Sequence, residues 1–186
     1  MLLALVLTPA ALAANVKVRV EGKTQTIFGG SQPQLVADNA LQALDVASTA
    51  GEFYYGMTPS TFGDYVSQIG KYGAAGSAGW VFKVNGVSPP VGADKVTLKD
   101  GDVVLWYYAT FGATGGPPTL ELQRLPGNCY VVSSVTDAGK RTRAAGAALA
   151  ADGKRFPAKA GRTCIGRHVG LVRATAPGAV RSNTVK

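Results

Sequence analysis

Two short apolar segments, residues 79–84 and 103–108, constrain the fold of this 186-residue chain more than any other feature. Asn85-Gly86 follows the first segment, and Asp100-Gly101-Asp102 precedes the second. These residue types tolerate the left-handed backbone of tight turns, so the sequence predicts two β-strands with sharply defined ends. The loop between them, residues 87–94, is apolar and carries two prolines, which make it too stiff to be a mere spacer.

Segments before this pair predict more strands and a helix. Val16, Val18 and Val20 alternate with charged residues, as in a half-buried strand, and a turn leads to a second strand over residues 24–28. Pro33 introduces an apolar stripe that predicts a helix over residues 34–50. The predicted fold class is therefore α+β, with a sheet of four to five strands that grips one helix.

The charge of the chain divides into two parts. Residues 1–120 hold seven Lys/Arg and eight Asp/Glu, whereas residues 121–186 hold twelve Lys/Arg and three Asp/Glu. The change falls just after a Gly/Pro-rich linker at residues 113–118. We therefore expect one domain at residues 14–112 and a second, basic domain at residues 119–186.

The second domain is expected to be all-β. Short strands are predicted at 119–125, 129–135, 146–150, 164–165 and 170–175. Their regular spacing predicts a small β-sandwich. Its basic surface predicts docking on anionic cell-wall polymer or a membrane surface, or is simply a solvated face. Nucleic acid is not an expected partner, because no aromatic residues are interleaved with the cations.

The first 13 residues predict export. They are apolar and too few to span a bilayer, and they end in Ala11-Leu12-Ala13, which fits a signal-peptide cleavage site. The Lys or Arg that usually stands at the start of a signal peptide is missing from this run. No later segment reaches the length of a transmembrane helix, so the expected localisation is secreted or loosely associated with the cell envelope. In that setting Cys129 and Cys164, the two cysteines, are predicted to form a disulfide.

The sequence offers little support for an enzyme. His168 is the one histidine, it lies in a basic segment, and no carboxylate neighbours it in sequence. No His/Cys group has zinc spacing, and Asp94, Asp100 and Asp102 lack the ligand spacing of a calcium loop. We expect no catalytic residue and no metal site.

Twelve aromatic residues lie between positions 53 and 111, and they favour a binding role. They either fill the core or form an exposed patch for a ligand or partner. The rigid proline loop is the expected edge of such a patch, because rigidity lowers the ordering cost of binding. The predicted ligand-binding residues lie on the two strands and in this loop: Trp80, Phe82, Pro90, Val91, Gly92 and Tyr108.

Four motifs carry a family resemblance over residues 15–110. They are Ala40-Leu41-Gln42-Ala43-Leu44, Gly63-Asp64-Tyr65-Val66-x-x-Ile69, Gly79-Trp80-x-Phe82-x-Val84-Asn85-Gly86 and Gly101-Asp102-Val103-Val104-Leu105-Trp106-Tyr107. In these the chain resembles the domain family of unknown function related to the C-terminal β-domain of transcobalamin and intrinsic factor. The resemblance implies a β-grasp-like fold and cobalamin as a ligand. The vitamin carriers close this domain against a large helical barrel, and these 186 residues predict no such barrel.

Residues 119–186 resemble the transthyretin-like or immunoglobulin-like accessory domains of exported bacterial proteins. The cues are Ala145-Gly146-Ala147 and Val180-Arg181-Ser182. Together the patterns predict an exported, non-enzymatic binding protein that holds a small ligand, a cobalamin-like one included, or a partner segment. The alternative is a cell-surface adhesion or structural module whose basic domain docks on the envelope.

Overall fold

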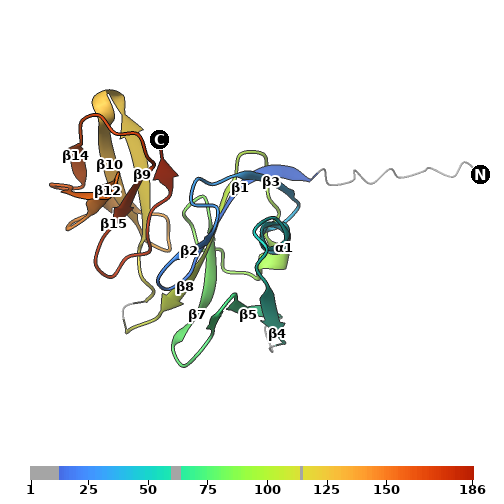
Figure 1. The fold of residues 1–186 in the computed structure, drawn as a ribbon. Helices are drawn as coiled ribbons and strands as arrows, with labels where there is room; N and C mark the ends of the chain where they lie inside the picture. Colours follow the sequence, from blue (N-terminus) through green and yellow to red (C-terminus); the bar gives the residue numbers. More distant parts are fainter. Residues whose placement is uncertain (1–12, 60–63, 114) are drawn as a thin grey trace, which may run out of the picture.

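Strands dominate both halves of the molecule (Figure 1). The computed structural model describes residues 13–59, 64–113 and 115–186, and the predicted signal peptide therefore lies outside the described residues except for Ala13. The described strands form four sheets, accompanied by one α-helix and two short 3-10 helices. The predicted fold class, α+β followed by all-β, is therefore wrong, because the chain is mostly β and its strands are divided among several sheets.

The central sheet contains the two segments that are most sharply bounded in the sequence. Its strands are β1 (Ala14–Glu21), β2 (Thr26–Phe28), β3 (Gln34–Ala37), β7 (Ala78–Val84) and β8 (Val103–Thr110). They are ordered β2-β1-β8-β7, with β3 also paired to β1, and β1 runs parallel to β8. The predicted turns are confirmed, since φ is 53° at Asn85, 85° at Gly86 and 86° at Gly101.

Helix α1 (Ala40–Ala50) is shorter than predicted, because the first residues of the expected helix form β3 instead. Strand β3 pairs antiparallel with β1, from Ala14↔Ala37 to Lys17↔Gln34. The helix begins after Asn39, whose side-chain oxygen accepts the Gln42 N–H at 2.9 Å. A long-range strand pairing thus decides residues 34–37, where the local apolar stripe favoured a helix.

The segment between α1 and β7 forms a sheet of its own, which the sequence did not predict. Its strands are β4 (Tyr55–Thr58), β5 (Tyr65–Ile69) and β6 (Tyr72–Gly73). Separately, the loop after β7 contains the 3-10 helix η1 (Ala93–Lys95). Val66 and Ile69 of β5 are buried with α1 and with Trp80 and Trp106 in one core cluster. One face of β7 and β8 is covered in this way.

The C-terminal half consists of two four-stranded sheets with a shared core. The first contains β9 (Thr119–Leu125), β10 (Cys129–Val135), β11 (Arg141–Arg143) and β14 (Arg162–Cys164), with the 3-10 helix η2 (Pro126–Asn128) between β9 and β10. The second contains β12 (Ala148–Ala151), β13 (Lys154–Pro157), β15 (Val172–Thr175) and β16 (Thr184–Val185). The predicted division into domains at residues 113–118 stays a prediction.

The other face of β7 and β8 packs against the C-terminal half. Leu105, Tyr107 and Ala109 are buried there, with Val81 and Val180 packed against them. The central sheet is therefore covered on both faces, which explains why β8 is apolar in nearly every position instead of alternating.

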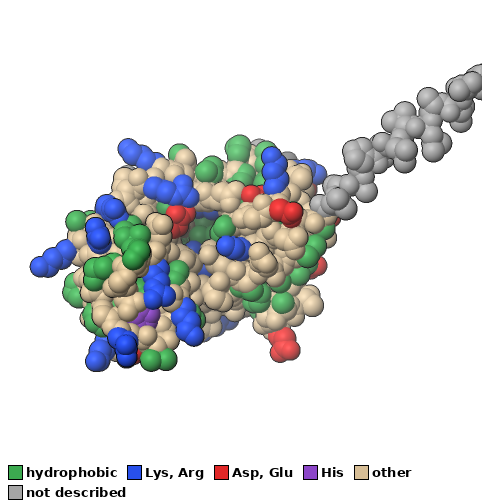
Figure 2. All heavy atoms as spheres, turned by 90° about the horizontal axis from the view of Figure 1, so that it is seen from above, with side chains coloured by type: hydrophobic (Ala, Val, Ile, Leu, Met, Phe, Trp, Pro, Cys, Tyr) green, Lys and Arg blue, Asp and Glu red, His purple; other side chains and the backbone are tan. Residues whose placement is uncertain are grey.

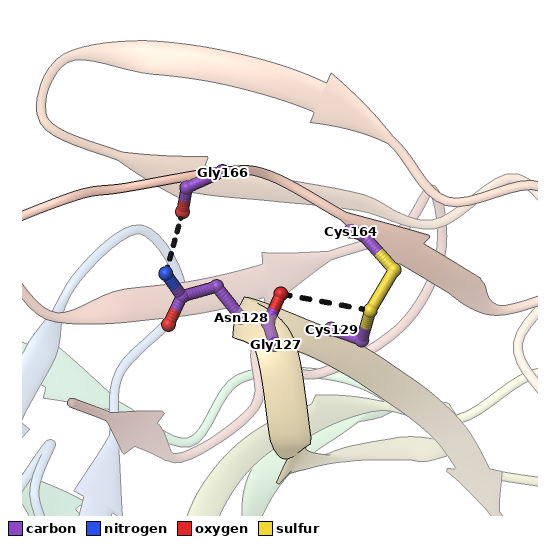
Figure 3. Close-up of a disulfide and its surroundings, with 5 residues drawn as sticks. All are labelled: Gly127, Asn128, Cys129, Cys164 and Gly166. Atoms are coloured by element: carbon purple, nitrogen blue, oxygen red, sulfur yellow. Dashed lines mark hydrogen bonds between the residues drawn. A yellow bond between two sulfur atoms is a disulfide. The ribbon is translucent and has the colours of Figure 1, made fainter.

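The predicted disulfide is confirmed. Cys129 of β10 and Cys164 of β14 are bonded and are also cross-strand partners (Figure 3). Beside the bond, the Asn128 side-chain amide donates to the Gly166 carbonyl at 2.9 Å. The bridge thus fastens one end of the first C-terminal sheet.

Across the described ranges, no helix has the length and apolar character required to cross a bilayer.

Candidate binding groove

An open groove of about 470 Å³ runs beside strand β7, the last strand of the central sheet. Its lining residues come from α1, β4, β5, β7, β8, the proline loop and the C-terminal half: Leu41, Met57, Asp64, Tyr65, Val66, Trp80, Val81, Phe82, Ser88, Pro89, Gly92, Ala93, Asp94, Trp106, Tyr107, Phe111 and Asp137. We call this surface the β7 groove. Its size is within the range of cavities that hold small organic ligands.

Fixed aromatic rings form much of the groove wall. Phe82 stacks on Trp106 with ring centroids 5.0 Å apart, and Trp80 meets Tyr108 edge to face at 5.6 Å. The Trp106 indole N–H donates to the Ala40 carbonyl at 3.1 Å. Because their neighbours fix these rings, a ligand would encounter a preformed apolar surface.

Two more aromatic side chains reach the groove from its rim. Tyr65 on β5 is 47% exposed, and Phe111, just after β8, is 39% exposed. Met57 on β4 is exposed beside them. Large apolar side chains that stay exposed around a cavity are typical of a surface that a ligand or partner covers.

The acidic lining residues differ in their partners. The Asp137 carboxylate forms an ion pair with the Lys83 ammonium at 3.2 Å and accepts a hydrogen bond from the Tyr107 hydroxyl at 3.3 Å. Burial, and then the charge of Asp137, raises the pKa of Tyr107 well above its usual range, so the phenol keeps its proton. Burial lowers the pKa of Lys83, and the bond to Asp137 opposes that effect.

Asp94 is an exposed residue of the groove lining. Its carboxylate meets the Lys95 ammonium at 2.8 Å, and that hydrogen bond lowers the pKa of Asp94. Both side chains are largely exposed, so solvent screens the pair and it is expected to add little stability.

The structure places three of the predicted binding residues on the groove wall: Trp80, Phe82 and Gly92. Pro90 and Val91 lie in the same loop but do not line the groove, although both are exposed. Tyr108 lies behind Trp80 and instead borders a smaller cavity between the two halves.

Sequence reasoning missed several lining residues. Tyr65 lies within one of the family motifs, so the sequence held a signal that could have identified it. Asp137 comes from a turn of the C-terminal half, and Phe111 follows the end of β8. No local pattern could have placed either residue beside β7, because tertiary packing brings them there.

His168 is not among the residues that line the β7 groove. Its two ring nitrogens are 2.6 Å from the Tyr130 hydroxyl and 3.0 Å from the Gly170 carbonyl oxygen. If Nδ1 donates to that carbonyl, Nε2 accepts from Tyr130, so a neutral imidazole satisfies both contacts. Among the residues that the structure describes, no group of three or more His, Cys, Asp or Glu side chains could hold a metal ion.

Comparison with known proteins identifies one family match. Residues 36–110, less than half of the chain, match a family model described as a domain of unknown function, DUF4430. The matched range begins in β3 and ends with β8, so it contains most of the residues that line the groove. That description names no vitamin carrier, and the resemblance to the carriers stays a prediction.

Thirteen chains of solved structures also match, whereas no curated protein does. One is a protein from Ruminococcus gnavus ATCC 29149 that is described provisionally as metal binding. It is 16% identical, the alignment covers 51% of this chain and 95% of that chain, and the TM-score is 0.37. A similarity this low transfers neither a fold nor a ligand.

Proposed function

We propose that this chain is a non-enzymatic binding protein of the cell exterior and that its ligand lies in the β7 groove. The observation that carries the proposal is the aromatic wall around an open, preformed cavity. Trp80 and Phe82 form the wall, and Tyr65 and Phe111 stand exposed at its rim. Such a site gains affinity from apolar burial at a low ordering cost.

Two features support an exterior location. The Cys129–Cys164 disulfide is typical of proteins that fold in an oxidising compartment. The apolar start of the chain has the pattern of an export signal. Measuring the mass of the protein recovered from culture medium tests this part of the proposal, since export predicts a product that lacks residues 1–13.

Both tryptophans of the chain line the groove, so intrinsic fluorescence reports on the site. We expect compounds from a library of neutral and cationic aromatic and aliphatic molecules to change this emission on titration. Tyr65→Ala should weaken binding about tenfold or more, because it removes apolar contact with the ligand. The exposed ring has little structural role, so the variant should stay folded. Tyr54→Ala is the matched control, since Tyr54 is 60% exposed, lies next to β4 and does not line the groove.

The proposal fails if no compound changes the emission at millimolar concentration, or if Tyr65→Ala binds as tightly as Tyr54→Ala. Cyanocobalamin belongs in the panel as the probe for a corrinoid ligand. A corrinoid is larger than the groove and would be covered on one face only. Because Trp80 lines the groove, Trp80→Ala should weaken the quenching of tryptophan fluorescence by cyanocobalamin. Absence of quenching by millimolar cyanocobalamin would reject the corrinoid version alone.

A second candidate function is docking on an anionic envelope polymer through the C-terminal half. All three carboxylates within residues 121–186 are already engaged: Glu121 with Arg141, Asp137 with Lys83, and Asp152 with backbone N–H groups. Ten cations of the same segment are exposed: Arg124, Lys140, Arg141, Arg143, Lys154, Arg155, Lys159, Arg162, Arg167 and Lys186. Figure 2 shows Lys and Arg side chains spread over this end of the molecule as separate groups.

Pull-down on purified cell wall tests this second function. Binding should fall steeply as salt rises from about 0.05 to 0.5 M, because exposed charges are screened over about 10 Å or less. Lys154→Ala combined with Arg155→Ala should weaken it further, whereas Tyr65→Ala should not. Binding that ignores salt would contradict electrostatic docking.

A further inference from the structure

Strand β7 has an open edge, because β8 is the one described strand that pairs along its length. Two hydrogen bonds show which residues of β7 bond to β8. The Phe111 N–H donates to the Ser77 carbonyl and the Asn85 N–H to the Val103 carbonyl, both at 2.9 Å. In an antiparallel pair, alternate residues exchange bonds with the partner strand. The N–H and C=O groups of Trp80 and Phe82 therefore point away from β8.

The open edge is short and closed at both ends. Ala75 and Ala78 exchange backbone hydrogen bonds of 2.9 and 3.0 Å, and Val84 and Val87 do the same. Between these two turns, the backbone groups of Trp80 and Phe82 have no hydrogen-bond partner among the described residues. The available window is thus two N–H and two C=O groups.

This window faces the β7 groove. The groove is lined by Trp80 and Phe82 from one face of β7 and by Val81 from the other, so it wraps around the strand edge. Met57 and Tyr65, from β4 and β5, form one part of its wall, and Ser88 and Pro89, from the proline loop, form another. An extended segment lying there would place alternate side chains against these two parts of the wall.

We propose that the ligand of the β7 groove is a short extended peptide with a basic residue, added as a strand to the edge of β7. This inference rests on the proposed function and names its ligand class. Four edge groups match about three to four residues of an added strand, and main-chain hydrogen bonds would supply affinity while the walls select side chains.

The charge of the groove selects the basic residue. Its lining contains Asp64, Asp94 and Asp137 but no Lys or Arg, on a protein with a net charge of +8. The Lys83 ammonium is fully buried and pairs with Asp137, so it does not neutralise the other carboxylates at the groove rim. Asp94 is already paired with the exposed Lys95, so a cationic side chain is favoured near Asp64, and an acidic one is disfavoured.

The closed ends of the window argue against a second copy of this chain as the occupant. A strand with the full length of β7 would run into the Ala75–Ala78 and Val84–Val87 turns. A free segment of a few residues avoids both. Sedimentation velocity examines this alternative directly, and a dimer that Phe82→Pro dissociates would overturn the peptide proposal.

The first experiment selects from a phage-displayed library of linear heptapeptides on the full chain. We expect enriched sequences with alternating apolar residues and Lys or Arg. Phe82→Pro removes the edge N–H, which β8 does not use, and proline is tolerated on such an edge. Phe82→Ala is the matched control, because it removes the same ring and keeps the N–H group.

A synthetic peptide with the enriched sequence should bind Phe82→Pro about 3- to 10-fold more weakly than Phe82→Ala, as loss of a single hydrogen bond predicts. Near-UV circular dichroism verifies that both variants keep the native packing. N-methylation of successive peptide nitrogens provides an independent measurement on wild-type protein. Strand addition predicts loss of affinity at every second position.

Equal binding to the two variants, or equal tolerance of methylation at every position, would overturn the inference. So would a library that yields no enriched sequence or an acidic consensus. If the library fails while a small compound quenches fluorescence in a Tyr65-dependent way, the proposed function stands and the peptide inference is wrong. If neither binds, both fail.

Discussion

At the residue scale, Asp152 shows how one exposed carboxylate organises a turn. Its two oxygens accept the backbone N–H groups of Val169 and Gly170 at 2.9 and 2.7 Å. Its own φ is 48° and Gly153 follows at 73°, so the β12–β13 turn uses two left-handed residues. The side chain therefore connects this turn to a loop 17 residues further along the chain.

Hydrogen bonds to the ionised form, first from Val169 and then from Gly170, lower the pKa of Asp152 below its ordinary value of 3.8. The stabilisation is thus fully present above about pH 3.8 and is lost as the pH falls through the lower folded-state pKa. We predict that Asp152→Asn lowers the urea midpoint at pH 7 and that its difference from wild type shrinks below pH 3.8. Asparagine tolerates the same φ, so the turn itself is retained.

Glu52→Gln serves as the control for Asp152→Asn, because Glu52 is exposed and also has a positive φ of 51°. It should leave the midpoint unchanged at both pH values. A difference between Asp152→Asn and wild type that persists unchanged at pH 2.5 would mean that the charge is not what stabilises the turn.

At the scale of elements, β10 holds the first C-terminal sheet together. It pairs with β9, β11 and β14, and the disulfide connects it covalently to β14. Its buried residues Tyr130, Val132 and Val135 lie at zero exposure. The bridge closes a sequence separation of 35 residues, so it restricts the unfolded chain more than any contact within this sheet can.

We predict that replacing Cys129 and Cys164 by alanine together lowers the free energy of unfolding by up to about 4 kcal/mol, the chain-entropy value for a loop of this length. Urea unfolding of the oxidised protein, followed by circular dichroism, provides the measurement. Wild type reduced with dithiothreitol should match the double variant. A double variant as stable as oxidised wild type would show that the unfolded chain is compact without the bridge.

Elements set by local chemistry could be predicted from the sequence. The strands β7 and β8 are bounded by turn residues with the expected positive φ, and strands β9 and β10 have the predicted limits. The start of α1 could not be predicted, because residues 34–37 pair with a strand some twenty positions earlier. For the same reason, strand periodicity and the proline loop placed Trp80, Phe82 and Gly92 at the groove, but only tertiary packing adds Phe111 and Asp137.

At the scale of the whole molecule, a buried charge cluster joins the two halves. Glu21, at zero exposure on β1, meets the guanidinium groups of Arg19 at 3.1 Å, Arg181 at 2.9 Å, and Arg173. Burial lowers the pKa of Arg19 to about 10, with Glu21 opposing that effect, so the Arg19 guanidinium stays charged at neutral pH. One carboxylate thus compensates three cations, two of which come from the C-terminal half.

A second buried contact lies further along the same face. The Lys83 ammonium on β7 donates to the Val135 carbonyl at 3.1 Å and to the Thr119 hydroxyl at 3.3 Å. With the Glu21 cluster, it places charged groups of the central sheet against both C-terminal sheets. Separation of the halves would expose these groups and the apolar face at Leu105 and Tyr107 together, so we expect the molecule to unfold as one unit.

Glu21→Gln tests this coupling, because it removes the charge and nearly preserves the volume. Three buried or half-buried arginines would lose their counter-charge, so the free energy of unfolding should fall by about 3 kcal/mol or more. In wild type, urea transitions followed by tryptophan fluorescence, which reports on the N-terminal half, and by far-UV circular dichroism should coincide. In Glu21→Gln they should separate or both move to lower urea.

The matched control is Glu121→Gln, which removes an exposed carboxylate that pairs with Arg141 inside the C-terminal half. Exposed pairs contribute at most about 1 kcal/mol, so this variant should retain coincident transitions near the wild-type midpoint. If Glu21→Gln is as stable as Glu121→Gln, the Glu21 cluster does not hold the halves together, and apolar packing at Leu105 and Tyr107 must do so alone. Two separate transitions in wild type would instead show that the halves fold independently, as the expected linker at residues 113–118 would allow.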